Sequence, residues 1–178
     1  RAASGELDVR DPRTRKQQKQ LLFMVVDGSG SMFSNNGLGA SRAAGIVMNR
    51  LEAVIDGHAE LYLRFFDDSL RKQEFHADSV ESARELMRVI SDPCQYQGGD
   101  TEFEGTLKAA SARAEEVLGS RSLRDPEIVF VTDGEATVPE LSTLKGNKLH
   151  VFQVGEEENC ALSRLARLSG GMGVYLGQ

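Results

Sequence analysis

The feature that most constrains the fold is an unbroken apolar run at residues 21–26, which stops abruptly at Asp27 and Gly28. A strand that is apolar at every position has both faces buried, which is typical of the centre of a parallel sheet covered by helices. Residues 40–55 then carry apolar side chains at helical spacing and end at Asp56 and Gly57. A buried strand, a polar Gly-rich loop and a helix are therefore expected in that order.

The alternation of strand and helix patterns continues to the end of the chain. We expect further strands at 60–66, 70–77, 127–132, 149–154 and 173–176, and helices at 80–90, 103–118, 139–144 and 160–168. Asp67 and Asp68 indicate a tight, solvated hairpin turn, which makes the second and third strands antiparallel. The predicted fold class is α/β, with a doubly wound, mostly parallel six-stranded sheet, one antiparallel edge strand and helices on both faces.

Length and charge favour one soluble domain. The chain has 178 residues, of which 40% are apolar, and this is enough to fill a sizeable core. The formal charge of −6 is scattered, so the surface gives no general encouragement to nucleic acid or anionic membranes. We assign residues 21–178 to the domain. Residues 1–20, which lack apolar periodicity and hold a basic cluster at 10–19, are interpreted as a linker or tail from a larger protein.

The cysteines and the absence of export signals bear on location. Cys94 and Cys160 lie in unrelated segments without metal-ligand spacing, so we expect free, buried thiols and a reducing compartment. No segment approaches the roughly 18 apolar residues of a membrane span, and no signal peptide is evident. We therefore expect a cytoplasmic protein. An extracellular or cell-surface location is the alternative if a longer chain carries a signal.

Three polar loops are expected at one edge of the sheet, because ligands of open α/β folds collect at the carboxyl ends of the strands. Their sequences are Asp-Gly-Ser-Gly-Ser at 27–31, Gln-Gly-Gly-Asp-Thr at 97–101 and Thr-Asp-Gly-Glu at 132–135. Carboxylates and hydroxyls without His or Cys suit Mg²⁺, Mn²⁺ or Ca²⁺ rather than zinc. The predicted metal-binding residues are Asp27, Ser29, Ser31, Thr101 and Asp133. They leave at least one coordination position for water or for a carboxylate of another molecule.

These motifs, in this order at strand ends, resemble the von Willebrand factor type A domain, also called the integrin I domain, over residues 21–176. Its metal-ion-dependent adhesion site is written Asp-x-Ser-x-Ser, then a distant Thr, then Asp in a Thr-Asp-Gly context. The resemblance implies that Ser29, Ser31 and Thr101 contact Mg²⁺ directly. It also implies that Asp27 and Asp133 act largely through bound water, and that a protein partner donates an Asp or Glu carboxylate to the ion.

Two departures from the family pattern bear on the site. Asp100 stands between Gly99 and Thr101 where the family commonly has Gly-Gly-Thr, which makes Asp100 a competitor for the ion. The family's last helix has no counterpart after Leu176, which argues against integrin-like gating. Partner choice is assigned to rim residues, since the metal alone recognises any carboxylate. The predicted rim residues are Met32, Phe33, Asn35, Asn36, Gln95, Tyr96, Glu102 and Glu135.

A narrower resemblance concerns the carboxyl-terminal A domain of bacterial cytoplasmic proteins that work with MoxR-type AAA+ ATPases. It implies an adaptor that recruits a substrate protein to such an ATPase. An extracellular adhesion domain is the alternative. A Mg²⁺-dependent phosphohydrolase is a third reading, because haloacid-dehalogenase-type phosphatases also keep an Asp at the end of the first strand. Those enzymes need a second Asp two residues later, and position 29 is Ser. We therefore expect no enzymatic activity.

Overall fold

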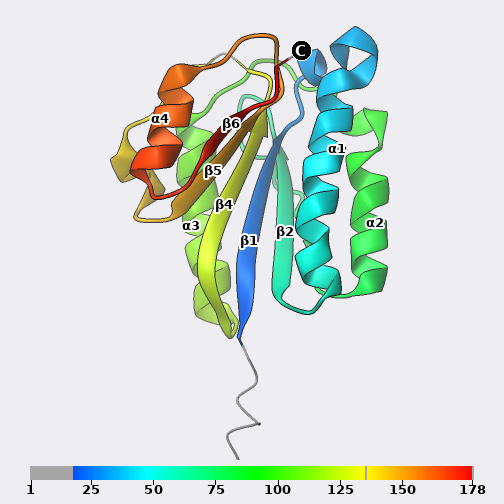
Figure 1. Ribbon diagram of the computed structural model, residues 1–178, viewed down its shortest axis with the longest axis vertical. Coiled ribbons are helices and arrows are strands. Elements are labelled where there is room, and N and C mark those ends of the chain that lie inside the picture. Colours follow the sequence, from blue (N-terminus) through cyan, green and yellow to red (C-terminus); the bar gives the residue numbers. More distant parts are fainter. Residues whose placement is uncertain (1–17, 135, 178) are drawn as a thin grey trace, which may run out of the picture.

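A six-stranded sheet forms the centre of the molecule, with strand order β3-β2-β1-β4-β5-β6. The computed structural model describes residues 18–134 and 136–177 and, at Asn35, the backbone alone. Every described strand pair is parallel except β2 and β3, which are antiparallel, so the predicted fold class is confirmed. The strands are β1 (Lys19–Asp27), β2 (Ala59–Phe66), β3 (Phe75–Ala77), β4 (Leu123–Thr132), β5 (Lys148–Gln153) and β6 (Gly173–Tyr175) (Figure 1).

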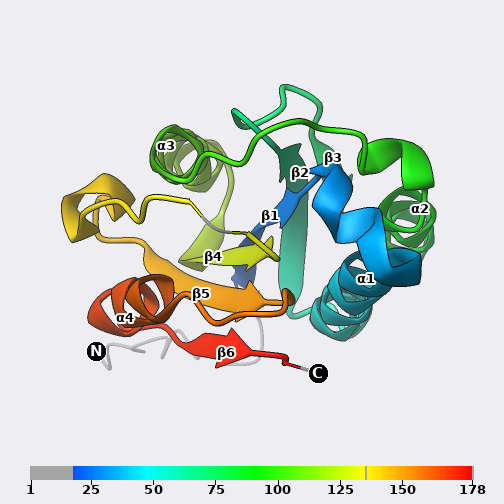
Figure 2. The same cartoon turned by 90° about the horizontal axis from the view of Figure 1, so that it is seen from above.

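Helices cover both faces of the sheet, with α1 and α2 on one side and α3 and α4 on the other (Figure 2). The α-helices are α1 (Ser34–Ile55), α2 (Val80–Ile90), α3 (Glu104–Ser120) and α4 (Cys160–Leu168). Short 3₁₀ turns lie at η2 (Gly30–Phe33), η3 (Pro93–Gln95) and η4 (Leu141–Leu144). No described helix is both long and apolar enough to cross a membrane.

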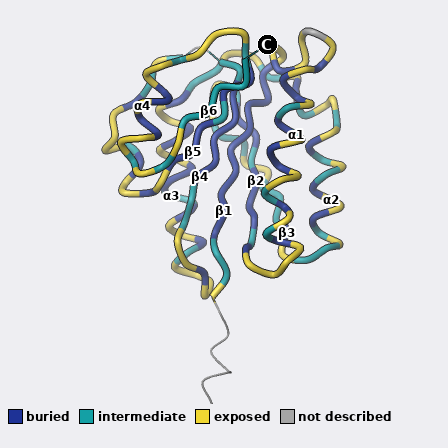
Figure 3. Tube along the Cα trace, in the orientation of Figure 1, coloured by how far each residue is buried: buried dark blue, intermediate teal, exposed yellow. Residues whose placement is uncertain are grey.

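The apolar run at 21–26 explains why β1 lies at the centre. β1 pairs in parallel with β2 on one side and with β4 on the other. Its alternate side chains enter two separate cores: Met24 packs under α1 and α2, whereas Phe23 packs under α3 and α4. All six residues of the run are at most 3% exposed, and this part of β1 is coloured as buried in Figure 3. The prediction of a buried central strand is confirmed.

Several predicted boundaries are wrong. α1 begins at Ser34 rather than at residue 40, so much of the expected loop is helical. Its first turn lacks apolar periodicity and is irregular, since Asn36 and Gly37 have positive φ angles of 58° and 75°. β3 is only three residues long, because Leu70 makes an isolated bridge to Phe66 rather than a ladder. β1 begins at Lys19, two residues before the predicted start of the apolar strand.

The thiols are free but not buried. Cys94 and Cys160 are both exposed, which corrects the prediction of buried cysteines. Cys94 lies in the surface turn η3, and Cys160 is the first residue of α4, where the side chain points away from the sheet's core.

Candidate metal centre

The candidate site lies where β1 and β4 end side by side, and hydrogen bonds connect four of its predicted ligands. Asp27, the last residue of β1, is fully buried, and its Oδ1 accepts from the Ser29 N–H at 2.9 Å. The Ser29 and Ser31 hydroxyl oxygens are 2.9 Å apart. Ser31 Oγ in turn donates to Asp133 Oδ1 at 3.1 Å. A continuous chain of hydrogen bonds therefore joins the end of β1 to the loop after β4.

A residue that the sequence reasoning missed orients the buried carboxylate. Thr132, the last residue of β4, donates its hydroxyl to Asp27 Oδ2 at 2.6 Å and accepts from the Gly134 N–H at 2.8 Å. Both oxygens of Asp27 are thus held by hydrogen bonds from the chain. The signal was present in the sequence, because Thr132 precedes Asp133 in the same motif and ends a buried strand.

The third loop is tied to the first by main-chain hydrogen bonds. The Gly30 N–H donates to the Gly98 carbonyl at 3.1 Å, and the Gly98 N–H donates to the Gly28 carbonyl at 2.9 Å. This pairing brings Thr101 to the site, where a Cβ added at Gly134 would lie 3.1 Å from the Thr101 methyl carbon. A side chain at position 134 would therefore crowd the site, which accounts for the glycine.

Asp67 and Arg71 form an ion pair, called here the Arg71 clasp, that is hydrogen-bonded to the loops of the site. Arg71 donates to Asp67 Oδ2 from Nε at 3.0 Å and from Nη2 at 2.9 Å. Its guanidinium also donates to the Gln95 carbonyl at 2.8 Å and to the Gly28 carbonyl at 3.1 Å. One planar cation therefore holds three segments in fixed positions, as its fork of donors allows.

The interpretation of Asp67 as a solvated turn residue is wrong. Its side chain is only 18% exposed, and its main-chain carbonyl accepts from the Glu102 N–H at 2.9 Å. Asp67 packs closely against the third loop, since a Cβ at Gly98 would lie 2.6 Å from its Oδ2. Asp68 is exposed, as expected. Nothing in the sequence marks Arg71 as a partner of Asp67 beyond its spacing of four residues.

The electrostatics of the site favour a cation. Burial raises the pKa of Asp27 from 3.8 to about 6, against the hydrogen bonds from Ser29 and Thr132. Burial also raises the pKa of Asp133, against its bond from Ser31. Within the described ranges, no basic side chain forms an ion pair with either carboxylate. A desolvated carboxylate without a cationic partner is unfavourable, so a bound cation would stabilise both groups. The predicted ligand set thus fits a divalent ion.

The site opens into a cavity of about 740 Å³. Some of the residues that line it were predicted as metal ligands and others were not. Ser29, Ser31, Thr101 and Asp133 line it, and so does the exposed Asp100. The other residues that line the cavity were not predicted, although some of them follow β5, which ends at the same edge of the sheet. These residues include Ser34, Leu38, Arg42, Val154, Gly155, Glu156 and Glu157.

Comparisons with known proteins agree with this architecture. No protein-family model matches the chain, and no curated protein matches it in sequence. Solved structures do match it, and the three described next are 16 to 18% identical to this chain. An aerotolerance-related membrane protein from Bacteroides fragilis superposes with a TM-score of 0.64 at 16% identity, covering 89% of this chain and 92% of that one. BatB from Bacteroides thetaiotaomicron gives 0.61 at 17%, covering 89% and 91%. Manganese-loaded TRAP protein from Plasmodium vivax gives 0.62 at 18%, covering 90% and 69%.

The chain has the von Willebrand factor type A fold. Within this fold the predicted metal residues meet at the carboxyl edge of the sheet, where the first and fourth strands end. Sequence identities of 16 to 18% support a shared fold and nothing more. The chemistry of the site is therefore inferred from this chain's own residues.

Three residues predicted on the rim of the A-domain site have other roles. Met32 is 0% exposed and packs in the core beneath α1. Tyr96 is 3% exposed, and its hydroxyl donates to the Ile90 carbonyl at 2.8 Å. Glu102 caps α3, since its carboxylate accepts from the Glu104 N–H at 2.7 Å. Their positions in the sequence placed them on the rim of the candidate site, but their side chains are buried or bonded to neighbouring main-chain groups.

Other rim predictions differ in outcome. Phe33 is 45% exposed and Asn36 is also exposed, so both are open to a partner. Gln95 is half-buried, and its carbonyl is engaged by Arg71. The side chain of Asn35 and all of Glu135 lie outside the described residues.

Proposed function

We propose that this A domain is a protein-binding module that uses a divalent cation to capture an Asp or Glu carboxylate of a partner. Mg²⁺ is the proposed ion, with Mn²⁺ or Ca²⁺ as substitutes. The observation that carries the proposal is the hydrogen-bonded chain from Asp27 to Asp133 beside an open cavity. Asp27 is buried and Asp133 is partly buried, and within the described residues neither carboxylate forms an ion pair with a basic side chain.

Each residue type has a role in this proposal. The hydroxyls of Ser29, Ser31 and Thr101 would contact the ion, and the carboxylates of Asp27 and Asp133 would supply the negative charge, largely through water. Two carboxylates balance the two positive charges, while neutral hydroxyls leave the ion electrophilic enough to take another carboxylate. Thr132 fixes the orientation of Asp27 in advance. When bound, the ion would supply an anchoring point for an anionic oxygen.

The surroundings suggest what flanks the partner's carboxylate. Leu38 is apolar, 40% exposed and lines the cavity. Phe33 is apolar and 45% exposed, and it precedes the cavity-lining Ser34 in the chain. Asp100 and Glu157 are exposed acidic residues that line it. A partner segment with an apolar residue and a basic residue next to its Asp or Glu would match both features.

For the cellular role, we propose an adaptor that recruits a substrate protein to a MoxR-type AAA+ ATPase in the cytoplasm. An extracellular adhesion domain is the second candidate, and the same chemistry of carboxylate capture would serve it. Catalysis is not part of the proposal, because Ser29 stands where a phosphatase of this strand arrangement needs its acid. Phosphatase turnover with Mg²⁺ that Asp27→Ala abolishes would refute this last point.

The test is partner capture with the immobilised protein in Mg²⁺, in EDTA, and in EDTA followed by excess Mg²⁺. A partner should bind in Mg²⁺, leave in EDTA and return on Mg²⁺ addition, and Asp27→Ala should lose it. Asp56→Asn is the matched control, because Asp56 is an exposed carboxyl at the far end of α1. A partner that stays bound in EDTA would contradict the metal-dependent mechanism.

A further inference from the structure

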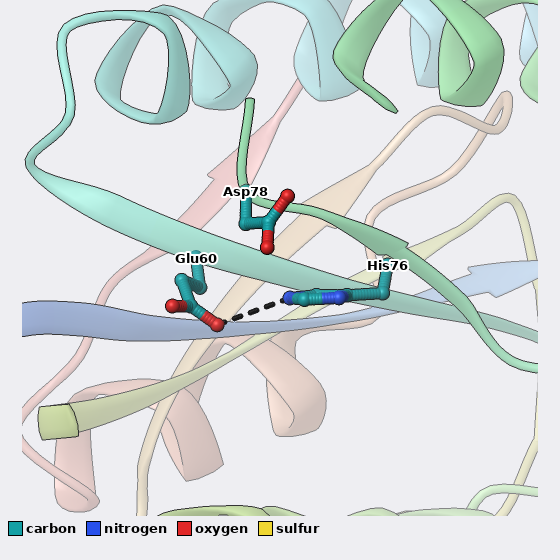
Figure 4. A group of neighbouring side chains, drawn as sticks. All are labelled: Glu60, His76 and Asp78. Atoms are coloured by element: carbon teal, nitrogen blue, oxygen red, sulfur yellow. Dashed lines mark hydrogen bonds and ion pairs between the residues drawn. The ribbon is translucent and has the colours of Figure 1, made fainter. Parts of the chain in front are cut away.

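We infer that Glu60, His76 and Asp78 form a second cation site, of the kind that takes Zn²⁺, on the β2–β3 edge of the sheet. One ligand atom from each of the three side chains lies within 4.8 Å of the other two. His76 Nε2 is 3.0 Å from Glu60 Oε2, and the Asp78 carboxylate lies beside this pair (Figure 4).

The strand register creates this cluster. β2 and β3 are antiparallel, with Leu61 opposite Ala77 and Tyr62 opposite His76. Continuing that register places Asp78 opposite Glu60, on the same face of the hairpin as His76. Two carboxylates directly opposite each other on neighbouring strands repel. A cation held between them would turn this repulsion into attraction.

The donor set selects the type of ion. An imidazole nitrogen with two carboxylates is a normal ligand set for Zn²⁺, at ligand distances of about 2.0–2.2 Å. Two ligand atoms of a tetrahedral Zn²⁺ site are about 3.3 Å apart. Small side-chain movements would therefore bring the three ligand atoms to the spacing that the ion requires. Mg²⁺ instead prefers an octahedron of oxygens. The second site therefore differs in chemistry from the all-oxygen centre at the carboxyl ends of β1 and β4.

Neighbouring groups hold the ligands near this arrangement. The His76 ring stacks on Tyr62, with ring centroids 4.3 Å apart and planes inclined by 21°. Arg121 donates to Glu60 Oε2 at 3.0 Å and balances part of the negative charge. The ion would compete with Arg121 for one of the two Glu60 oxygens. Three protein ligands leave a fourth position for water.

The second site is independent of the proposed carboxylate-binding centre. Glu60 pairs with Leu21, which lies six residues before Asp27 on β1. At about 3.3 Å per residue, the two sites are about 20 Å apart. A Zn²⁺ ion here would fasten the three-residue strand β3 to β2 at the sheet's exposed edge.

Isothermal titration calorimetry of the protein with Zn²⁺, in the presence of excess Mg²⁺, tests this inference. Mg²⁺ should occupy the proposed all-oxygen centre at Asp27 and Asp133 without competing for the His76 imidazole. The wild type should bind one Zn²⁺ that His76→Gln and Asp78→Asn weaken about tenfold or more. His58→Gln and Asp68→Asn are the controls, since both residues are exposed and outside the cluster. They should bind Zn²⁺ as the wild type does.

Circular dichroism of each variant would establish that the fold is retained. Asp78 is exposed, so its substitution keeps the inference testable if the loss of the His76 ring disturbs packing on Tyr62. Wild-type protein that binds no Zn²⁺, or Zn²⁺ uptake that is the same in His76→Gln, would overturn the inference.

Discussion

Asp27→Asn should stabilise the metal-free protein at neutral pH while abolishing metal binding. Burial raises the pKa of Asp27 from 3.8 to about 6 in the folded state. Between these pH values the folded chain binds more protons than the unfolded chain, so the free energy of unfolding falls as the pH rises from about 4 to about 6. The shift corresponds to a penalty of about 3 kcal/mol at neutral pH, which removal of the charge abolishes.

The substitution also has a cost. The amide nitrogen of Asn cannot accept the Thr132 hydroxyl hydrogen that Asp27 Oδ2 accepts at 2.6 Å, a loss of about 1 kcal/mol. The variant should therefore be about 2 kcal/mol more stable than the wild type near pH 8, and about 0.5 kcal/mol less stable near pH 4.

Urea denaturation in EDTA across this pH range measures the effect. The difference between wild type and Asp27→Asn isolates residue 27, because every other titrating group is common to both proteins. Addition of Mg²⁺ near pH 8 should stabilise only the wild type. A difference in unfolding free energy that stays constant with pH would refute the assignment of a desolvated, unpaired charge to Asp27.

Four further substitutions test the loops around the site. Arg71→Ala should lower the free energy of unfolding by about 2 kcal/mol in urea denaturation and weaken Mg²⁺ binding in calorimetry, because Asp67 loses its cation; unchanged Mg²⁺ affinity would contradict the clasp. Thr101→Ala should reduce metal-dependent partner capture whereas Asp100→Asn should not, and the reverse result would make Asp100 the ligand. Gly134→Ala should weaken Mg²⁺ binding, because its Cβ would lie 2.8 Å from Thr132 Oγ1; wild-type affinity would show that the loop adjusts freely.

The fold was predictable because its determinants are local. The apolar run at 21–26 specifies a strand buried on both faces, and helical spacing identifies α2 and α4 with the observed bounds. The boundaries that failed lack such signals. Ser34–Gly39 has no apolar period, and its helical turn depends instead on contacts such as the Ser34 hydroxyl with the Ser31 carbonyl and on the burial of Met32.

The site was predictable to the extent that strand ends determine it. Asp27 ends β1 and Asp133 directly follows β4, its parallel neighbour, so the strand order alone brings the two residues together. The Arg71 clasp depends on side-chain direction across three segments, which spacing does not reveal. The inward orientation of Tyr96 was missed for the same reason, since a residue near a metal loop can equally well face the core.

The most direct test of the central claim is anomalous X-ray diffraction from crystals grown with Mn²⁺. We expect an anomalous peak in the cavity, between the hydroxyls of Ser29 and Ser31 and the Asp133 carboxylate, and no such peak in Asp27→Ala crystals. A wild-type map without a peak at that position, under conditions where Mn²⁺ is in excess, would contradict it.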